Sequence, residues 1–223
     1  MKRVPILLCV LPAILSLARG VVLINETDSD NPATDNLEFV ELYNPDALAV
    51  SLTGLTVVFF NGNGDVAYLS QDLDGFTIPA NGYFVLGNAA VLNADVTFPD
   101  NTLQNGPDAV ALYTANATDF PVGTAVTTTG LIDAVVYDTS DADDAGLLVL
   151  LQPGQLQVDE NATASSTTVS IGRLGDGAGG ARVTSSYSVM TPTPGFANIP
   201  EPSTALIMLL ALVPRRRSRS AAA

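Results

Sequence analysis

Histidine and tryptophan are absent from this 223-residue chain, and cysteine and lysine each occur once, as Cys9 and Lys2. The missing histidine excludes nucleophilic catalysis by Ser–His or Cys–His pairs and zinc sites with histidine ligands. Because Cys9 lies in a leading apolar stretch, the chain that follows has no disulfide and no thiol chemistry. Carboxylates remain as the candidate catalytic groups.

Positive charge is nearly missing from the central part of the chain. Residues 21–199 contain 22 acidic residues and only two cations, Arg173 and Arg182, which gives this segment a formal charge of −20. A body this acidic repels phosphate backbones, because nucleic-acid-binding proteins neutralise phosphates with Lys and Arg. The composition therefore argues against nucleic acid as a partner, favours divalent cations and keeps the protein soluble.

The first twenty residues have the three parts of a secretory signal peptide. Residues 1–3 are positively charged, residues 4–17 are apolar, and residues 18–20 form a small-x-small cleavage site. The apolar stretch is short for a membrane-spanning helix, which needs about 20 apolar residues. We expect export, with residues 1–20 removed after Gly20.

Residues 37–45, Leu-Glu-Phe-Val-Glu-Leu-Tyr-Asn-Pro, predict a strand around which the rest of the chain is organised. Apolar and aromatic residues favour a strand, and the Asn-Pro step ends it with turn chemistry. Side chains alternate between the two faces of a strand. We therefore expect Val40 and Leu42 in the core and Glu41 facing outward.

Short strands separated by turns follow along the chain. Two Asn-Gly steps within residues 61–65 predict a hairpin, because Gly and Asn tolerate positive φ. No window shows capped helical periodicity, and the repeated strands predict a β-sandwich. Further strands are expected at residues 22–26, 83–86, 108–113, 131–137, 147–151 (a buried apolar run) and 167–173.

Several motifs occur in the order found in one bacterial family. They are the Ile-Asn-Glu strand at 24–26, the strand at 38–44, Leu-x-Gly at 52–54, the string at 78–86, Ser-Ile-Gly-Arg at 170–173 and the closing segment 191–198. Together they resemble the bacterial lamin-tail domain over residues 21–198. The resemblance implies an all-β, immunoglobulin-like β-sandwich for the domain at residues 21–199. Such domains occur alone and attached to secreted enzymes, so the fold does not give the function.

The C-terminal residues 200–223 look like a PEP-CTERM sorting signal. Pro200, Glu201 and Pro202 precede a short apolar run at 205–213, and an arginine cluster then follows: Arg215, Arg216, Arg217 and Arg219. The resemblance implies an exosortase-type membrane protease as partner. The apolar run predicts a short helix that covers little more than half of a bilayer core of about 30 Å, so we expect a transient, processed anchor.

Catalysis would have to use carboxylates, as in glycoside hydrolysis. The candidates are Glu38, Glu41, Asp133 and Glu160, but no motif groups two of them. Acidic residues on strands are more often solvated or structural. We therefore expect no enzyme activity, with a secreted carboxylate hydrolase as an alternative.

Calcium is the one candidate cofactor, because Ca²⁺ prefers several carboxylate and carbonyl oxygens. Acidic residues crowd two loops. The first contains Asp28, Asp30, Asn31 and Asp35, and the second contains Asp138, Asp141, Asp143 and Asp144, our calcium candidates. Neither loop fits the EF-hand spacing, so the choice lies between a different kind of calcium loop and an ordinary solvated turn.

Arg173 follows an apolar strand, and Asp133 lies in another strand among Ile, Ala and Val. If both side chains point inward they must pair, because a buried unpaired charge is costly. We hypothesise an Arg173–carboxylate contact with Asp133 as first candidate. The alternation of side chains by itself also allows the alternative, in which Arg173 is exposed at the end of a strand.

The sequence as a whole predicts an exported, non-catalytic β-sandwich with a structural or adhesive role at the cell envelope, cell surface or extracellular matrix. A calcium- or carbohydrate-binding module is the alternative, with an envelope or matrix polysaccharide as partner. The membrane would be engaged only transiently, through the C-terminal tail.

Overall fold

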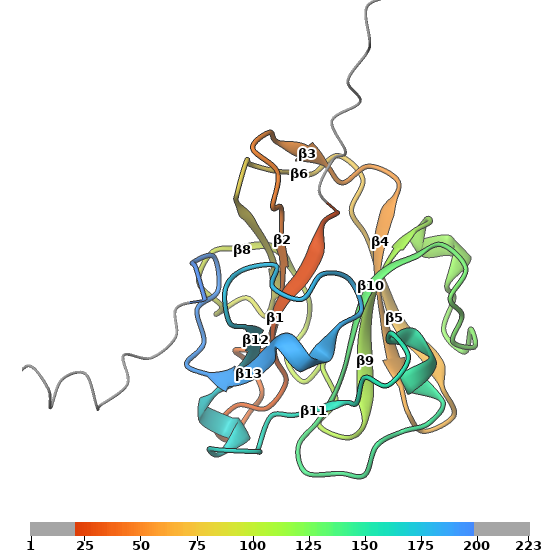
Figure 1. Cartoon of the computed structure of the whole chain (residues 1–223), viewed down its shortest axis with the longest axis vertical. Helices are drawn as coiled ribbons and strands as arrows, with labels where there is room; N and C mark the ends of the chain where they lie inside the picture. The colour runs from red at the N-terminus through yellow and green to blue at the C-terminus, as the bar shows by residue number, and fades with distance from the viewer. Residues whose placement is uncertain (1–20, 199–223) are drawn as a thin grey trace, which may run out of the picture.

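The computed structural model describes residues 21–198, which form two β-sheets packed face to face (Figure 1). The predicted signal peptide and sorting tail lie outside these residues. Within residues 21–198, no helix is long and apolar enough to cross a membrane.

The first sheet has six strands in the spatial order β13-β12-β1-β2-β7-β8. Its strands are β1 (Leu23–Asp28), β2 (Phe39–Tyr43), β7 (Tyr83–Gly87), β8 (Ala94–Thr97), β12 (Ser170–Arg173) and β13 (Tyr187–Met190). All neighbours pair antiparallel except β7 and β8, which are parallel. The predicted central strand is β2, which lies between β1 and β7.

The second sheet has five strands in the order β11-β10-β9-β4-β5. Its strands are β4 (Leu55–Asn61), β5 (Val66–Asp72), β9 (Asp108–Thr114), β10 (Leu131–Asp138) and β11 (Val158–Asp159). Strands β4 and β5 form the hairpin that the Asn-Gly steps predict, with Gly64 and Asp65 at positive φ in the turn. A small ribbon of β3 (Val50–Ser51) and β6 (Thr77–Ile78) completes the strands.

The main core lies between the two sheets. Val40 and Leu42 of β2 are fully buried there, as alternation predicts, and they share the core with Phe59 of β4 and Val135 of β10. Full burial of such a side chain contributes about 1.5–3 kcal/mol. This shared interior therefore fixes how the two sheets face each other.

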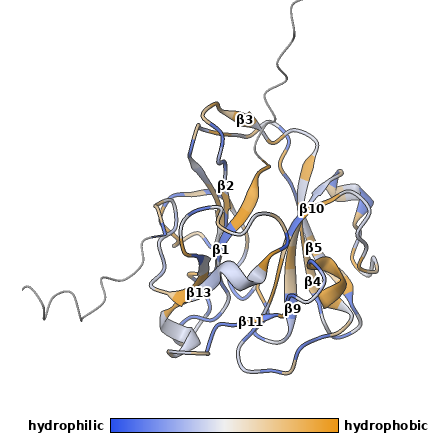
Figure 2. Cartoon of the chain, in the orientation of Figure 1, coloured by the Kyte–Doolittle hydropathy of each residue, from blue (hydrophilic) through white to orange (hydrophobic). Residues whose placement is uncertain are grey.

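A second apolar cluster covers the outer face of the five-stranded sheet. Here the prediction of a buried strand at 147–151 is wrong, because Leu147–Leu150 forms the short 3-10 helix η2. Leu147 and Leu150 are buried against Phe60 and neighbouring residues, whereas Val149 is 51% exposed. Burial at a spacing of three residues fits a helical turn, not a strand, and the helix is mostly orange in Figure 2.

The remaining helices are also single 3-10 turns: η1 (Ala117–Asp119), η3 (Ser166–Thr168) and η4 (Thr184–Ser186). Because η3 occupies the start of the strand expected at 167–173, β12 begins only at Ser170. The register of β1 against β2 shifts between Ile24 and Glu26, which makes Asn25 a bulge. This irregularity positions the polar residues described below.

Candidate functional site

The Arg173–Asp133 contact that the sequence predicts is present between the two sheets. Arg173 Nη2 lies 3.1 Å from Asp133 Oδ2, and both side chains are fully buried. Arg173 Nε also donates to the Ile24 carbonyl at 2.8 Å, and the guanidinium carbon lies 4.7 Å from the centroid of the Tyr187 ring. A planar guanidinium suits this many partners, because it presents five donors in a fixed geometry.

Both members of this ion pair have further partners. Arg173 Nη1 donates to the carbonyls of Ala178 and Gly180 at 2.6 and 2.8 Å, which ties the glycine-rich loop to the core. Asp133 accepts backbone N–H groups of Ile24, Ala134 and Arg182. Burial raises the pKa of Asp133, while the guanidinium and these N–H donors oppose that shift. The Arg173 guanidinium is therefore fully engaged by the fold and is not available to a ligand.

Arg182, the other cation of residues 21–198, has a structural position as well. Its guanidinium donates to the carbonyls of Val149, Leu150 and Leu151, at the C-terminal end of η2. Terminal carbonyls of a helix lack internal partners, and a cation is favourable there. Both arginines are thus used by the fold.

Glu41 lies on the outer face of its sheet, as alternation predicts, but it is fully buried there. The segment at residues 191–198, here called the strap, covers the outer face of the six-stranded sheet at this point. Glu41 Oε2 accepts the Gly195 N–H at 2.7 Å, and Glu41 Oε1 accepts Asn25 Nδ2 at 2.8 Å. Glu26 accepts the N–H and hydroxyl of Thr193 at 2.9 and 2.7 Å. The alternation of side chains predicted the correct face of the sheet for Glu41, but it could not show that the strap covers this face.

The strap is held at its end by a third acid. Asp176 Oδ1 accepts the Asn198 N–H at 3.0 Å and also accepts Asn25 Nδ2, while its other oxygen accepts the Tyr83 hydroxyl. Burial raises the pKa of Glu26, and it raises the pKa of Glu41 to about 8. Glu26 and Glu41 receive neutral donors and no cation, so burial favours the protonated form of these two carboxyl groups.

The other candidate catalytic acids are bound into the structure separately. Glu38 Oε2 accepts Asn88 Nδ2 and the Thr102 N–H, whereas Glu160 accepts the N–H and hydroxyl of Ser29. Burial raises the pKa of Glu38 to about 7 and that of Glu160 to about 8. Each carboxyl group has its own structural donors, and the four candidates do not line one cleft.

The calcium candidates are spread along a loop. Asp138 accepts the N–H groups of Ser140 and Asp141, and Asp144 accepts those of Gly146 and Leu147. Asp141 and Asp143 are exposed. Within residues 21–198, no three acidic side chains are grouped so that they could hold a metal ion. These contacts are those of Asx turns, in which the side chain bonds the backbone two residues on.

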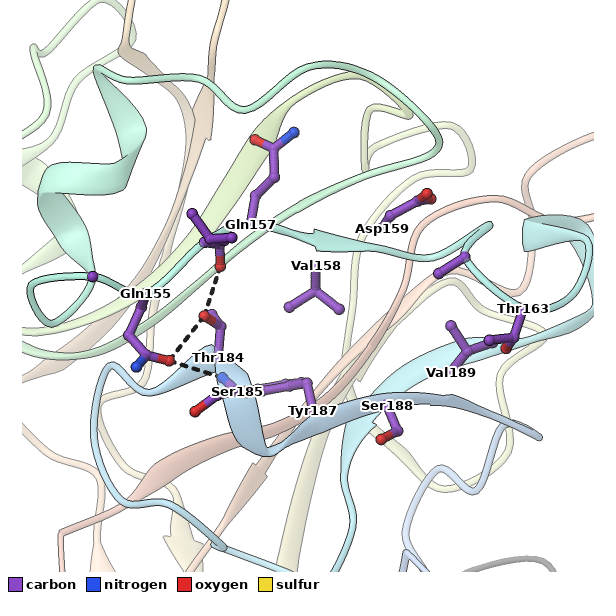
Figure 3. Close-up of a pocket in the computed structure, with 13 residues that line it drawn as sticks. Gln155, Gln157, Val158, Asp159, Thr163, Thr184, Ser185, Tyr187, Ser188 and Val189 are labelled. Carbon is purple, nitrogen blue, oxygen red and sulfur yellow. Dashed lines mark hydrogen bonds between the residues drawn. The ribbon is translucent and has the colours of Figure 1, made fainter.

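One opening among the described residues was not predicted from the sequence. It is a cleft of about 490 Å³ between β11, at the edge of one sheet, and β13, at the edge of the other (Figure 3). Its lining comes from two segments, residues 154–163 and 184–189. Because these segments are more than twenty residues apart, no local motif could reveal it.

The cleft offers mostly neutral hydrogen-bonding groups around an apolar floor. Gln155 Oε1 accepts the Ser185 N–H at 2.8 Å, and Thr184 donates to the Leu156 carbonyl at 2.6 Å, which fixes one end (Figure 3). Val158 and Val189 contribute the apolar surface, and Asp159 is the only charged residue of the lining. This chemistry suits binding rather than acid–base catalysis, which needs at least one positioned acid or base near a second group.

Two antiparallel-dominated sheets packed over a common interior, with short turns and no α-helix among residues 21–198, define an immunoglobulin-like β-sandwich. The sequence matches the lamin tail domain family over residues 16–139, which is more than half of the chain, and the protein belongs to that family. The match ends just after β10, yet β11, β12 and β13 complete the two sheets. A comparison with curated proteins gives no match.

Proposed function

We propose that this protein is an exported, non-catalytic β-sandwich with a structural or adhesive role at the cell envelope, cell surface or extracellular matrix. The observation that carries the proposal is the order of parts along the chain. A signal-peptide-like segment precedes a lamin tail domain, and Pro200, Glu201 and Pro202 follow it with an apolar run and an arginine cluster. Each part alone is a weak indicator, but the three together specify export and retention.

The tail serves as a removable address for an exosortase-type protease. The Pro-Glu-Pro triplet begins two residues after the last residue of the strap, and its prolines lead us to expect an extended backbone that a protease can reach. Arg215, Arg216 and Arg217 favour the cytoplasmic side of the membrane, so the domain faces away from the cytoplasm. The apolar run is short for lasting residence in a bilayer.

The absence of catalysis is supported by the positions of the acids. Glu38, Glu41, Asp133 and Glu160 are fully buried and engaged in structural hydrogen bonds. A glycosidase needs two carboxyl groups flanking a substrate bond at a defined separation. Release of reducing sugar from a panel of envelope polysaccharides by the purified protein would contradict this part of the proposal.

Intact-mass measurement on protein from the native host tests the sorting. The expected mature species begins near Val21 and ends near Pro200–Pro202. Recovery of a species that still carries Ala223 contradicts processing, and recovery in the cytoplasmic fraction contradicts export. A variant with Arg215, Arg216 and Arg217 replaced by Ala should accumulate as unprocessed precursor, whereas a matched variant with Ser218 and Ser220 replaced by Ala should be processed normally.

A further inference from the structure

The outer edge of β13 faces the cleft between the two sheets, and its hydrogen-bonding pattern can be assigned. The Leu174 N–H donates to the Ser186 carbonyl, and this pair continues the antiparallel ladder in which Gly172 lies opposite Ser188. Hydrogen-bonded pairs recur every second residue of such a ladder. The backbone groups of Ser188 and Met190 therefore bond to β12, and those of Tyr187 and Val189 point away from it. The Tyr187 N–H donates to the Thr184 carbonyl of η4, so the Tyr187 carbonyl and both backbone groups of Val189 remain at the edge.

This edge is less protected than the corresponding edge at β5. There the chain covers the sheet with its own backbone, because Ala67 exchanges hydrogen bonds with Gly123 and Thr124 and Val66 pairs with Ala125. Strand β13 pairs with β12 alone and ends its sheet. Its sequence, Tyr-Ser-Val-Met, has no charge and no proline, and its ladder has no bulge, so none of these three features blocks pairing along its four residues.

The surroundings of this edge suit an added strand. The cleft borders Tyr187 and Val189 on one side and Val158 on the other, which gives an apolar floor for every second side chain of an incoming strand. Gln157 and Ser188 lie in the lining and can bond to the alternate polar side chains (Figure 3). No exposed aromatic ring lines the cleft, since Tyr187 is only 7% exposed, so a sugar would lack a stacking surface.

We propose that β13 binds an extended basic peptide segment of a partner protein, which adds to the six-stranded sheet as a seventh strand. The Tyr187 carbonyl and the N–H and carbonyl of Val189 supply the hydrogen bonds, as in other cases of strand addition. The negative charge of the domain favours a basic partner. A second copy of this domain would instead bring another formal charge of −20 into contact and be repelled. Asp159, at the cleft, pairs with a flanking Lys or Arg. The proposal goes beyond the structural or adhesive role, and it does not depend on export or sorting.

The test uses the isotope-labelled full chain and a synthetic probe of alternating Val and Thr with Lys at both ends. Before the probe is added, amide exchange should be faster at Val189 than at Ser188 and Met190. Adding the probe should slow exchange at Val189 selectively. Two versions of the peptide carry methyl groups on alternate backbone amides, one on each set. The version whose methylated amides face β13 should bind at least about tenfold more weakly, because it loses the hydrogen bonds to that strand.

Two protein variants separate strand addition from general charge attraction. Asp159→Asn should weaken binding of the Lys-ended probe several-fold and leave a Thr-ended probe unchanged. Asp100→Asn, at an exposed acid outside the cleft, is the matched control and should leave both unchanged. The proposal is overturned by probe binding without protection of the Val189 amide, by equal binding of the two methylated peptides, by preferential binding of a polysaccharide at the cleft, or by no binding at millimolar probe.

Discussion

The six-stranded sheet carries buried charge on both of its faces, and the two faces neutralise it differently. On the inner face, Arg173 and Asp133 form an ion pair with additional hydrogen bonds. On the outer face, Glu26 and Glu41 lie under the strap and receive N–H and hydroxyl donors but no cation. The two layers share β1, and burial raises the pKa of carboxyl groups in both, but only in the inner layer does a cation oppose that shift.

The interactions that connect the two sheets therefore differ from those that hold the strap. The ion pair connects β12 to β10, and removal of either partner leaves a charge without compensation in the interior. The outer layer connects the strap to β1 and β2 through acids whose charge depends on pH. Loss of the first should affect the whole fold, whereas change in the second should affect mainly how stability varies with pH.

Replacing Arg173 should have the largest effect. Arg173→Met keeps much of the side-chain volume but leaves Asp133 buried and unpaired, so we expect a loss of about 3–5 kcal/mol in the free energy of unfolding. Urea denaturation followed by circular dichroism measures it. The double variant Arg173→Met, Asp133→Asn should recover part of the loss, because it removes both charges and keeps an amide oxygen that can accept the backbone N–H groups. A single-variant loss below about 1 kcal/mol would contradict a structural ion pair.

The strap layer should produce the next largest effect, as a pH dependence. Glu41 has a folded-state pKa of about 8 against an ordinary value of 4.5. Because the folded state holds the proton more tightly, the stabilisation from Glu41 is complete below about pH 4.5 and is lost as pH rises through about 8. Asp28 and Glu160, with pKa values raised to about 9 and about 8 by burial, add to the same trend.

The variant Glu41→Gln removes the titrating carboxyl group, so it measures how much Glu41 contributes to the pH dependence of the free energy of unfolding. Its free energy of unfolding, measured between pH 5 and pH 8, should fall less steeply than that of the unmodified protein. Asp100→Asn, at an exposed position, serves as the control and should keep the original slope. If Glu41→Gln and the unmodified protein have parallel curves, the strap does not bury a titrating Glu41.

The contrast between the layers also explains which features the sequence predicted. The Arg173–Asp133 pair could be predicted because charge inside an apolar strand demands a partner, and only two cations were available in a domain of −20. The burial of Glu41 could not, because it depends on residues 191–198 returning over a strand more than 150 positions earlier. The cleft depends in the same way on two distant edges meeting. Similarly, the run at 147–151 is apolar enough for either a strand or a helical turn, and tertiary packing decided it.

A smaller effect is expected from the Tyr187 hydroxyl, which donates to the Ile24 carbonyl at 2.6 Å next to the ion pair. Tyr187→Phe leaves that carbonyl with its bond from Arg173, so no acceptor is orphaned. We expect a loss of about 0.5–1.5 kcal/mol in the free energy of unfolding, measured by urea denaturation. Tyr68→Phe is the matched control, since the Tyr68 hydroxyl is buried without a hydrogen-bond partner, and its loss should be smaller.

The smallest effect should come from the exposed acids of the loop after β10. Unlike the ion pair and the acids under the strap, these acids are neither paired nor buried. Asp141 and Asp143 are open to solvent, so Asp141→Asn and Asp143→Asn should change the free energy of unfolding by less than about 0.5 kcal/mol. Ca²⁺ and Mg²⁺ at equal concentration should raise the melting temperature by the same small amount, because both screen a body of −20. A rise specific to Ca²⁺ that disappears in both variants would instead show that the loop binds the ion. In that case a bound metal ion would neutralise the acids of the loop, whereas an arginine pairs with Asp133 and protonation neutralises the acids under the strap.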